Sequence, residues 1–307
     1  MAPVVHRSSG DLLADRRYAY AEAAWNEGDA AAAADLAGQA LDLAPDFAPA
    51  HALLGRATAA LGRTEEARRA LERALALEPD DALGAGIDLA QLGVLPEAEA
   101  ISTPYVRALF DEYAPRFDRH LLRSLNYRAP NLLRDALRRA CSRRFRPFRF
   151  GRVLDLGCGT GLLARALADV SDMIEGVDLS GRMLAAARKT KLYASLTEGD
   201  LLSFLSAREA GSADLVAAAD VLVYVADLRP IHAEARRVLG RDGLFAYTVQ
   251  SHDGSGFRLG ADGRFAHAEP HLRVLAAEAG FEVVSCEAVS TRQDRGEDVP
   301  GLLLVLA

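Results

Sequence analysis

The run from Val153 to Leu162 constrains the fold of this chain more than any other stretch. It opens with Val-Leu-Asp-Leu, which has the apolar character of a buried strand, and glycines then alternate at Gly157, Gly159 and Gly161. Alternating glycines permit positive φ angles and let a ligand approach the backbone closely. A helix that begins at the end of such a turn directs its free N–H groups at the ligand. The run therefore predicts a strand, a ligand-binding turn and a helix in succession.

The pattern after Pro147 predicts an α/β fold. Short apolar runs alternate with amphipathic segments, and such alternation places helices on both faces of a mostly parallel sheet. The expected strands are 153–156, 174–177, 194–197, 215–219, 244–248, 282–289 and 302–306. The expected helices are 162–168, 182–188, 201–207, 231–239 and 271–279. Because no helix separates the last two strands, we expect an antiparallel pair at one edge.

The spacing of the glycines distinguishes two kinds of nucleotide site. A dinucleotide-binding turn has a third small residue where Leu162 stands. Here an acid, Asp155, comes two residues before the first glycine, and this arrangement resembles the first motif of class I methyltransferases. The resemblance implies a Rossmann-like sheet of seven strands, with S-adenosyl-L-methionine as cofactor and S-adenosyl-L-homocysteine as product. It also implies that the loop, including Cys158, holds the methionine end of the cofactor, whose ammonium group favours the Asp155 carboxylate.

Two further strand ends continue the resemblance. Asp178 follows the second strand, at the spacing from which a carboxylate accepts hydrogen bonds from ribose hydroxyls. Leu179, beside it, is expected to wall the adenine ring. Asp200 and Leu201 follow the third strand, and by resemblance they face the adenine amino group and the ring.

The methyl side of the expected cofactor site has fewer markers. Ala219 and Asp220 follow the fourth strand and are expected near the methyl group, although Asp220 would serve equally well as a helix N-cap. An aromatic helix before the core, with Tyr113 and Phe117, is similar to helices that lie across the cofactor in small-molecule methyltransferases. Such a helix excludes water, and an aromatic face attracts a sulfonium. The alternative for each ring is packing on the core.

Methyl transfer to an amine or a hydroxyl needs a group that holds or removes the proton of the acceptor. The candidates for this catalytic role are two histidines after the fifth strand and the acid after the fourth, His267, His271 and Asp220. The candidates for binding the acceptor are Tyr224, His252, Arg264 and Arg292. The two arginines match the geometry of a carboxylate. Each of these residues also has a purely structural interpretation.

The N-terminal third repeats with a period of 34 residues, which separates Gly28 from Gly62 and Pro45 from Pro79. This pattern resembles the tetratricopeptide repeat, in which small residues let paired helices approach and a proline ends the second helix. We expect helical repeats over residues 11–95, a linker and helical lid over 96–150, and the methyltransferase core over 151–307. Because each repeat buries its face only against a neighbour, we expect the repeats to dock on the following domain.

Longer stretches resemble a bacterial family of predicted methyltransferases with N-terminal tetratricopeptide repeats. These stretches are 105–121, 220–228, 263–267 and 271–272. The resemblance carries over the fold and the cofactor but not the acceptor, for which our leading hypothesis is O- or N-methylation of a small molecule. Two alternatives stay open: a methyltransferase whose repeats recruit a protein substrate, and a scaffold protein that holds the cofactor without turnover.

Composition narrows the expected partners and location. A net charge of −7 disfavours a dedicated nucleic-acid binder, and the arginine-rich stretch 134–152 is interpreted as a solvated helix face and a loop. Three widely spaced cysteines predict neither disulfides nor a structural metal site, so we expect no metal. No apolar run reaches the roughly 20 residues of a membrane span, and no signal segment is visible. We therefore expect a cytoplasmic protein with no membrane partner.

Overall fold

A computed structural model describes residues 8–294 and 296–307. The chain forms two compact units, of which the first ends at Glu112 and the second begins at Tyr113. This boundary falls inside the segment expected to be linker and lid. No helix among the described residues is long and apolar enough to cross a membrane.

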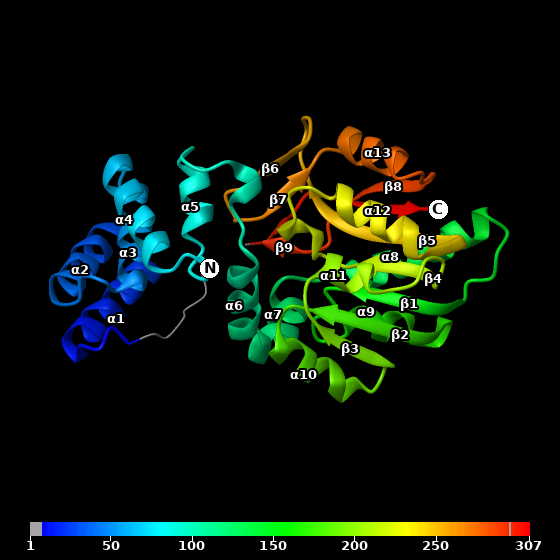
Figure 1. The fold of residues 1–307 in the computed structure, drawn as a ribbon, viewed down its shortest axis with the longest axis horizontal. Helices are drawn as coiled ribbons and strands as arrows, with labels where there is room; N and C mark the ends of the chain where they lie inside the picture. Colours follow the sequence, from blue (N-terminus) through cyan, green and yellow to red (C-terminus); the bar gives the residue numbers. More distant parts are fainter. Residues whose placement is uncertain (1–7, 295) are drawn as a thin grey trace. The chain divides into compact units, whose positions relative to one another are not determined.

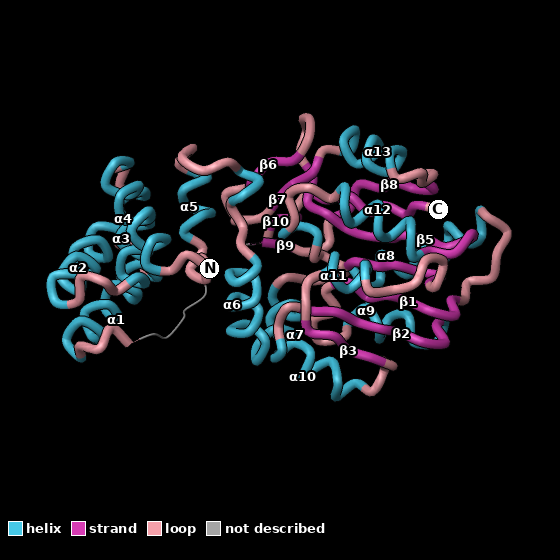
Figure 2. Tube along the Cα trace, in the orientation of Figure 1, coloured by secondary structure: helices cyan, strands magenta, loops and turns pink. Residues whose placement is uncertain are grey.

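The first unit is entirely helical (Figures 1 and 2). Its elements are α1 (Leu12–Asn26), α2 (Ala30–Leu43), α3 (Ala48–Ala60), α4 (Thr64–Leu77), α5 (Ala85–Gln91), the 3₁₀ turn η1 (Glu97–Glu99) and α6 (Thr103–Tyr113), whose last residue belongs to the second unit. Gly28 and Gly62, one repeat apart, follow α1 and α3 with positive φ angles of 86° and 75°. The helices approach closely because small residues lie where they meet. A Cβ on Gly55 of α3, for example, would lie only 2.5 Å from Cγ of Leu71 on α4.

The second unit contains the α/β fold expected from the sequence. The strands of the main path are β1 (Phe150–Leu156), β2 (Ser171–Asp178), β3 (Ser195–Glu198), β4 (Ala213–Ala218), β5 (Leu239–Ser251), β8 (Val283–Val289) and β11 (Gly301–Leu306). Their order in the sheet is β3-β2-β1-β4-β5-β11-β8. The first five are parallel, and β11 runs antiparallel to both β5 and β8. The seven expected strands and the antiparallel pair are confirmed.

Four short strands were not predicted. They are β6 (Phe257–Leu259), β7 (Phe265–His267), β9 (Gln293–Asp294) and β10 (Glu297–Asp298). β7 pairs with the end of β5 and with β6, whereas β9 and β10 pair only with each other in the described structure. Each is two or three residues long, which is too short to leave a period-two pattern in the sequence.

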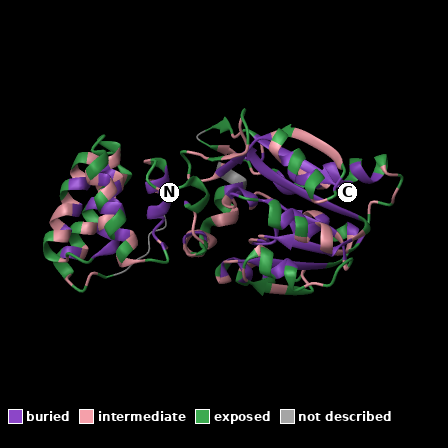
Figure 3. Ribbon diagram, turned by 45° about the horizontal axis from the view of Figure 1, so that its top comes forward, coloured by how far each residue is buried: buried purple, intermediate pink, exposed green. Residues whose placement is uncertain are grey.

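Helices cover both faces of the sheet. They are α7 (Phe117–Ser124), α8 (Ala129–Arg143), α9 (Leu162–Leu167), α10 (Gly181–Thr190), α11 (Leu201–Ser206), α12 (Arg229–Val238) and α13 (Glu269–Glu278). The 3₁₀ turns are η2 (Ala114–Arg116), η3 (Ala168–Val170) and η4 (Leu222–Tyr224). Figure 3 shows that the strands form the buried layer and that the helices expose their outer sides.

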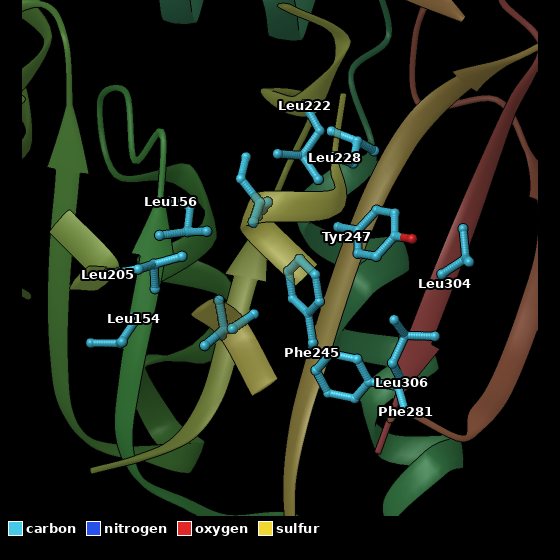
Figure 4. Packing of buried hydrophobic residues seen from close by; sticks show 14 of the residues in the cluster. Leu154, Leu156, Leu205, Leu222, Leu228, Phe245, Tyr247, Phe281, Leu304 and Leu306 are labelled. Carbon is cyan, nitrogen blue, oxygen red and sulfur yellow. The ribbon is translucent and has the colours of Figure 1, made fainter. Parts of the chain in front are cut away.

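Alternate side chains of each strand enter different cores, because successive residues of a strand point to opposite faces. Leu156, Phe245 and Tyr247 pack with residues of α11, α12 and α13 on one face, as Figure 4 shows for part of this cluster. Val153 and Leu244 pack with α8 and α9 on the other face. Two filled faces hold the strand ends in fixed positions, and the candidate site lies at those ends.

The arginines of 134–152 mostly bond within the chain. They reach acids or carbonyl groups of other elements, in the pairs Arg134–Asp169, Arg139–Glu287, Arg144–Glu282, Arg149–Asp172 and Arg152–Glu175. One face of α8 is also buried through Leu133 and Leu137. This stretch therefore anchors α8 to the sheet.

Candidate functional site

The candidate site lies at the carboxyl ends of β1, β2 and β4. The order of the strands reverses between β1 and β4, and ligands of open α/β sheets bind at such a switch point. We call the residues at the ends of β1 and β2 the cofactor side; they are Asp155, Gly157–Gly161 and Asp178. We call a second group, spread over four chain segments, the acceptor side; it consists of Asp220, Tyr224, Asp262, Arg264 and Arg292.

The glycine loop is held in a conformation that side chains rarely adopt. Gly157, Gly159 and Gly161 have φ angles of 63°, 53° and 91°. A Cβ on Gly157 would also lie 2.3 Å from Cγ2 of Val221. Gly161 is the N-cap of α9 and offers no side chain to the N–H groups of the first turn. The loop therefore presents bare backbone at the start of a helix, as the sequence predicted.

Asp178 ties the loop to the second strand. Its carboxylate accepts one hydrogen bond from the N–H of Gly159 at 2.8 Å and another from the N–H of Ser180 at 2.9 Å. The residue is 9 % exposed. The structure thus fixes this carboxylate at the end of β2, where ribose hydroxyls were expected.

Asp155 is a buried acid, and among the described residues no cation pairs with it. The residue is 2 % exposed, and Oδ2 accepts a hydrogen bond of 2.7 Å from the hydroxyl of Tyr193. Burial raises the pKa of Asp155 to about 7, the Tyr193 hydrogen bond opposes this rise, and the nearby Asp178 charge adds to it. A buried carboxylate of this kind is suited to receive a cationic group, since an opposite charge restores its ionised form.

The other cofactor candidates have different environments. The thiol of Cys158 is buried, and burial raises its pKa far above the ordinary value, so it is not a nucleophile. Leu179 and Leu201 are half-buried. Asp200 is exposed, and its carboxylate caps α11 by accepting a hydrogen bond from the N–H of Ser203 at 2.9 Å. Contacts of Leu179, Asp200 and Leu201 with adenine stay predictions.

The expected lid contacts the glycine loop. The rings of Tyr113 and Phe117 meet edge to face, with centroids 5.1 Å apart. The ring of Phe117 lies over the loop, 3.7 Å from where a Cβ on Gly159 would be. Asp118, the next residue of α7, accepts a hydrogen bond from the hydroxyl of Thr160. These contacts place α7 across the cofactor side.

Tyr127 was missed by the sequence analysis. It lies in the turn between α7 and α8, and its hydroxyl donates a hydrogen bond of 3.4 Å to the carbonyl of Ala219 at the end of β4. Burial raises the pKa of Tyr127 well above its ordinary value, and the charges of Asp220 and Asp155 raise it further. The hydroxyl therefore lies near both carboxylates, between the cofactor side and the acceptor side. An isolated tyrosine outside any motif gave no sequence signal.

Asp220 has an unusual backbone conformation at the end of β4. Its φ angle is 61°, which is uncommon for a residue other than glycine. Its N–H donates a hydrogen bond to the hydroxyl of Thr248, and its carboxylate accepts one from Thr291 at 3.0 Å. Val221, not Asp220, is the cap residue of η4. The alternative role of Asp220 as an N-cap is therefore wrong, and strained backbone at this position is typical of a functional site.

The acceptor side is a chain of alternating charges. Arg292 is 5 % exposed and reaches Asp220 at 3.3 Å and Asp262 at 3.6 Å. Arg264 reaches Asp262 at 3.3 Å, and its Nε donates a hydrogen bond of 3.1 Å to the Tyr224 hydroxyl. Four of these five residues were predicted from the sequence; Asp262, which joins the two arginines, was not.

The three candidate histidines lie close enough to influence one another. His267 is fully buried, and neither ring nitrogen makes a hydrogen bond of good geometry among the described residues. The same holds for Nε2 of His252 and of His271. Burial lowers the pKa of His267 to about 4, and His271 and His252 contribute. The backbone of Val225 and of Leu222 lies close enough to His267 to oppose this lowering of its pKa slightly. His267 is therefore neutral at pH 7, and its catalytic role stays a prediction.

Within residues 8–294 and 296–307, no three His, Cys, Asp or Glu side chains lie close enough together to hold a metal ion.

Comparison with known families assigns both units. Residues 154–247 match the model of a methyltransferase domain, and residues 24–92 match a tetratricopeptide repeat. The chain carries a methyltransferase domain behind a tetratricopeptide repeat. The methyltransferase match begins inside β1 and ends inside β5, so it includes the cofactor side and Asp220 but not Asp262, Arg264 or Arg292.

Several curated methyltransferases resemble the chain. A malonyl-[acyl-carrier protein] O-methyltransferase of Geobacter sulfurreducens is 36 % identical over 43 % of this chain and 56 % of its own length. A ubiquinone biosynthesis O-methyltransferase of Thiobacillus denitrificans is 31 % identical over 40 % of this chain and 53 % of its own. The chain therefore spans about half the length of these relatives. Among solved structures, an S-adenosylmethionine-dependent methyltransferase from Clostridium acetobutylicum covers 64 % of this chain and 98 % of its own, at 17 % identity and a TM-score of 0.47.

Proposed function

We propose that this chain transfers a methyl group from S-adenosyl-L-methionine to an oxygen or nitrogen atom of a small-molecule acceptor. The observation that supports this most strongly is the pair of hydrogen bonds from Gly159 and Ser180 to the Asp178 carboxylate. They fix the glycine loop and the acid of β2 at one strand edge, within the region that matches the methyltransferase domain. S-adenosyl-L-methionine supplies an activated methyl group on a sulfonium.

The residues of the cofactor side fit this compound. The Asp155 carboxylate is buried and, within the part of the chain that the structure describes, is not paired with a cation, so it suits the ammonium of the methionine end. The bare backbone from Gly157 to Gly161 lets the ligand approach closely. The Asp178 carboxylate is suited to ribose hydroxyls, because each of its oxygens can accept more than one hydrogen bond.

The contribution of the chain to the reaction is mainly alignment. Holding donor and acceptor in line gives effective molarities on the order of 10⁵ M or more. The Phe117 ring and α7 shield the loop from water, which protects a cationic electrophile. Tyr127 and Asp220 border the end of β4, where we place the methyl group.

The proton of the acceptor needs a base if the acceptor is neutral. Asp220 is the strongest candidate for this role, because its carboxylate lies at the end of β4 and is held by Thr291 and Arg292. His267 and His271 are second candidates. The low pKa of His267 makes it a weak base but an effective hydrogen-bond acceptor at neutral pH.

We place the protein in the cytoplasm, since its three cysteines are all free and unpaired cysteines are typical of a reducing compartment.

Transfer of radiolabel tests the proposal. The full chain is incubated with methyl-labelled cofactor and a lysate that is then separated into metabolite, protein and nucleic-acid fractions. Label in the metabolite fraction, abolished by Asp178→Ala, is the expected result. Label only in protein would overturn the small-molecule assignment and favour a protein acceptor recruited by the tetratricopeptide repeat. Cofactor binding with no label in any fraction would indicate a non-catalytic protein.

A further inference from the structure

One carboxylate oxygen on the acceptor side receives three donors. Oδ2 of Asp262 accepts a hydrogen bond from Nε2 of Gln250 at 2.9 Å. The same oxygen lies 3.3 Å from the guanidinium of Arg264 and 3.6 Å from that of Arg292. Two cations and an amide that converge on one point form a binding site for an anion. In this structure the carboxylate of Asp262 occupies that site.

The two arginines hold this oxygen loosely. The structural ion pairs of the same unit are shorter: Arg139 lies 2.8 Å from Glu287, and Arg208 lies 3.0 Å from Glu175. By contrast, both contacts of Arg292 with carboxylates are 3.3 Å or longer, and each joins a single nitrogen to a single oxygen. A guanidinium favours a bidentate partner. Within the described residues, this nearly buried guanidinium has none.

Two of the three donors, Arg292 and Gln250, differ from the acid in how they are held. Arg292 is 5 % exposed, and its carbonyl accepts hydrogen bonds from the N–H of Val299 and the hydroxyl of Ser290. Gln250 lies within β5 and is buried. Asp262 instead lies in the turn between β6 and β7, with a side chain 33 % exposed. Arg292 and Gln250 therefore belong to the framework. Arg264 lies in the same turn as Asp262, with a side chain 30 % exposed, and its backbone N–H donates a hydrogen bond of 3.3 Å to Oδ1 of Asp262. The acid and this one donor form the rim of the site.

We propose that the acceptor carries a carboxylate, which binds Arg264, Arg292 and Gln250 in the place that Asp262 occupies here. This inference rests on the proposed function and names the class of its acceptor. A planar carboxylate can engage a guanidinium through two oxygens, which Asp262 does not do in this structure. Arg292 also contacts Asp220, so the bound carboxylate lies next to the end of β4 and orients the rest of the acceptor there.

Asp262 acts in this account as a competitor for the site. A ligand whose site is filled by a group of the protein binds with reduced apparent affinity, because it binds only the fraction of molecules in which that group has left. Removal of the competing carboxylate therefore strengthens the binding of an anionic ligand. A residue that merely supported the site would have the opposite effect when removed, and this difference in sign makes the inference testable.

The test compares benzoate with its neutral analogue benzamide as probes. Both are titrated by ligand-observed NMR into the full chain saturated with S-adenosyl-L-homocysteine. Asp262→Ala is expected to tighten benzoate binding roughly tenfold, the size of effect expected when one competing charge is removed. The affinity for benzamide is expected to stay unchanged. Arg264→Gln is expected to weaken benzoate binding by a similar factor. Asp253→Ala is the matched control, because it removes an exposed acid from the loop before β6.

Three results overturn the inference. The first is that Asp262→Ala weakens benzoate binding or leaves it unchanged. The second is that Asp253→Ala tightens benzoate binding as much as Asp262→Ala does. The third is that benzamide binds as tightly as benzoate to every variant. Asp262→Asn, which keeps the shape and a hydrogen-bond acceptor, repeats the test if the alanine variant does not fold. Uptake of S-adenosyl-L-homocysteine is measured in the same samples. Failure of the benzoate arm with normal uptake rejects only this inference, whereas absence of uptake rejects the proposed function.

Discussion

The cofactor side and the acceptor side of the site are built in different ways. On the cofactor side, backbone N–H groups within a few residues of two strand ends hold the Asp178 carboxylate at 2.8 and 2.9 Å. On the acceptor side, side chains from the end of β4, η4, the β6–β7 turn and the segment before β9 meet through contacts of 3.1 to 3.6 Å. The first is fixed by local backbone geometry, and the second by long side chains that have other possible partners.

The difference matches the roles that we propose for the two sides. A rigid backbone cradle suits a cofactor whose structure does not vary. Acceptors vary, and side chains on loops change without disturbing the sheet. We therefore expect substitutions on the cofactor side to abolish cofactor binding, and substitutions on the acceptor side to change the affinity for the acceptor alone.

The largest expected effect is that of Asp178→Ala. The variant loses the acceptor of two backbone hydrogen bonds, one buried and one partly buried. Each is worth about 1.5–3 kcal/mol when one partner is charged. Affinity for S-adenosyl-L-methionine is expected to fall about 100-fold or more by calorimetry. Asp172→Ala, at the other end of β2 where the acid is exposed and pairs with Arg149, is the control and should bind normally. An equal loss of cofactor affinity in both variants would mean that cofactor binding does not depend specifically on the carboxyl end of β2.

A second test asks how tightly the loop is held. In Gly157→Ala the new Cβ lies 2.3 Å from Val221 at a φ angle of 63°. The variant is expected to lose about 1–3 kcal/mol of unfolding free energy from overpacking, measured by urea denaturation. Gly199→Ala is the matched control, because no atom lies within 4 Å of its Cβ. An unchanged stability of Gly157→Ala would show that the loop yields easily.

The fold was largely predictable from the sequence, and so were the positions of the cofactor-side residues at the strand ends. On the acceptor side, four of the five residues were named, but the contacts that join them were not predicted. Gly157, Asp155 and Asp178 lie at strand ends, where apolar runs and glycine spacing mark their positions directly. Asp262 and Tyr127 occupy turns with no pattern of their own, and only tertiary packing brings them to the end of β4. Arg264 and Arg292 were recognised as cations, but their shared partner depends on β6 and β7, which are too short to predict.

The pH dependence of cofactor binding tests the buried acid. With a pKa of about 7, Asp155 is largely protonated at pH 5 and ionised at pH 8. Only the ionised form attracts an ammonium, so affinity for S-adenosyl-L-methionine should rise with pH, by up to about tenfold per unit below pH 7, and level off above it. Asp155→Asn should bind more weakly and with a flat profile. Affinity that falls as the pH rises from 5 to 7 would contradict this assignment.

The smallest expected effect concerns the residue between the two sides. Tyr127→Phe removes a hydroxyl whose hydrogen bond to Ala219 is 3.4 Å long. A bond of this kind contributes about 0.5–1.5 kcal/mol, so we expect the rate of methyl transfer to fall several-fold at saturating cofactor. Tyr20→Phe, on the exposed surface of α1, controls for loss of a hydroxyl. A loss of cofactor affinity with an unchanged rate of methyl transfer would show that Tyr127 acts in cofactor binding and not in the transfer step.

The central claim is that the ends of β1 and β2 form a ready-made cradle for a sulfonium nucleoside. Calorimetric titration of the unmodified chain with S-adenosyl-L-methionine, its demethylated product and NADH tests it most directly. The account predicts that one molecule of the first two binds per chain and that NADH does not bind. Saturable binding of NADH, or no binding of either sulfur compound at millimolar concentration, would contradict it.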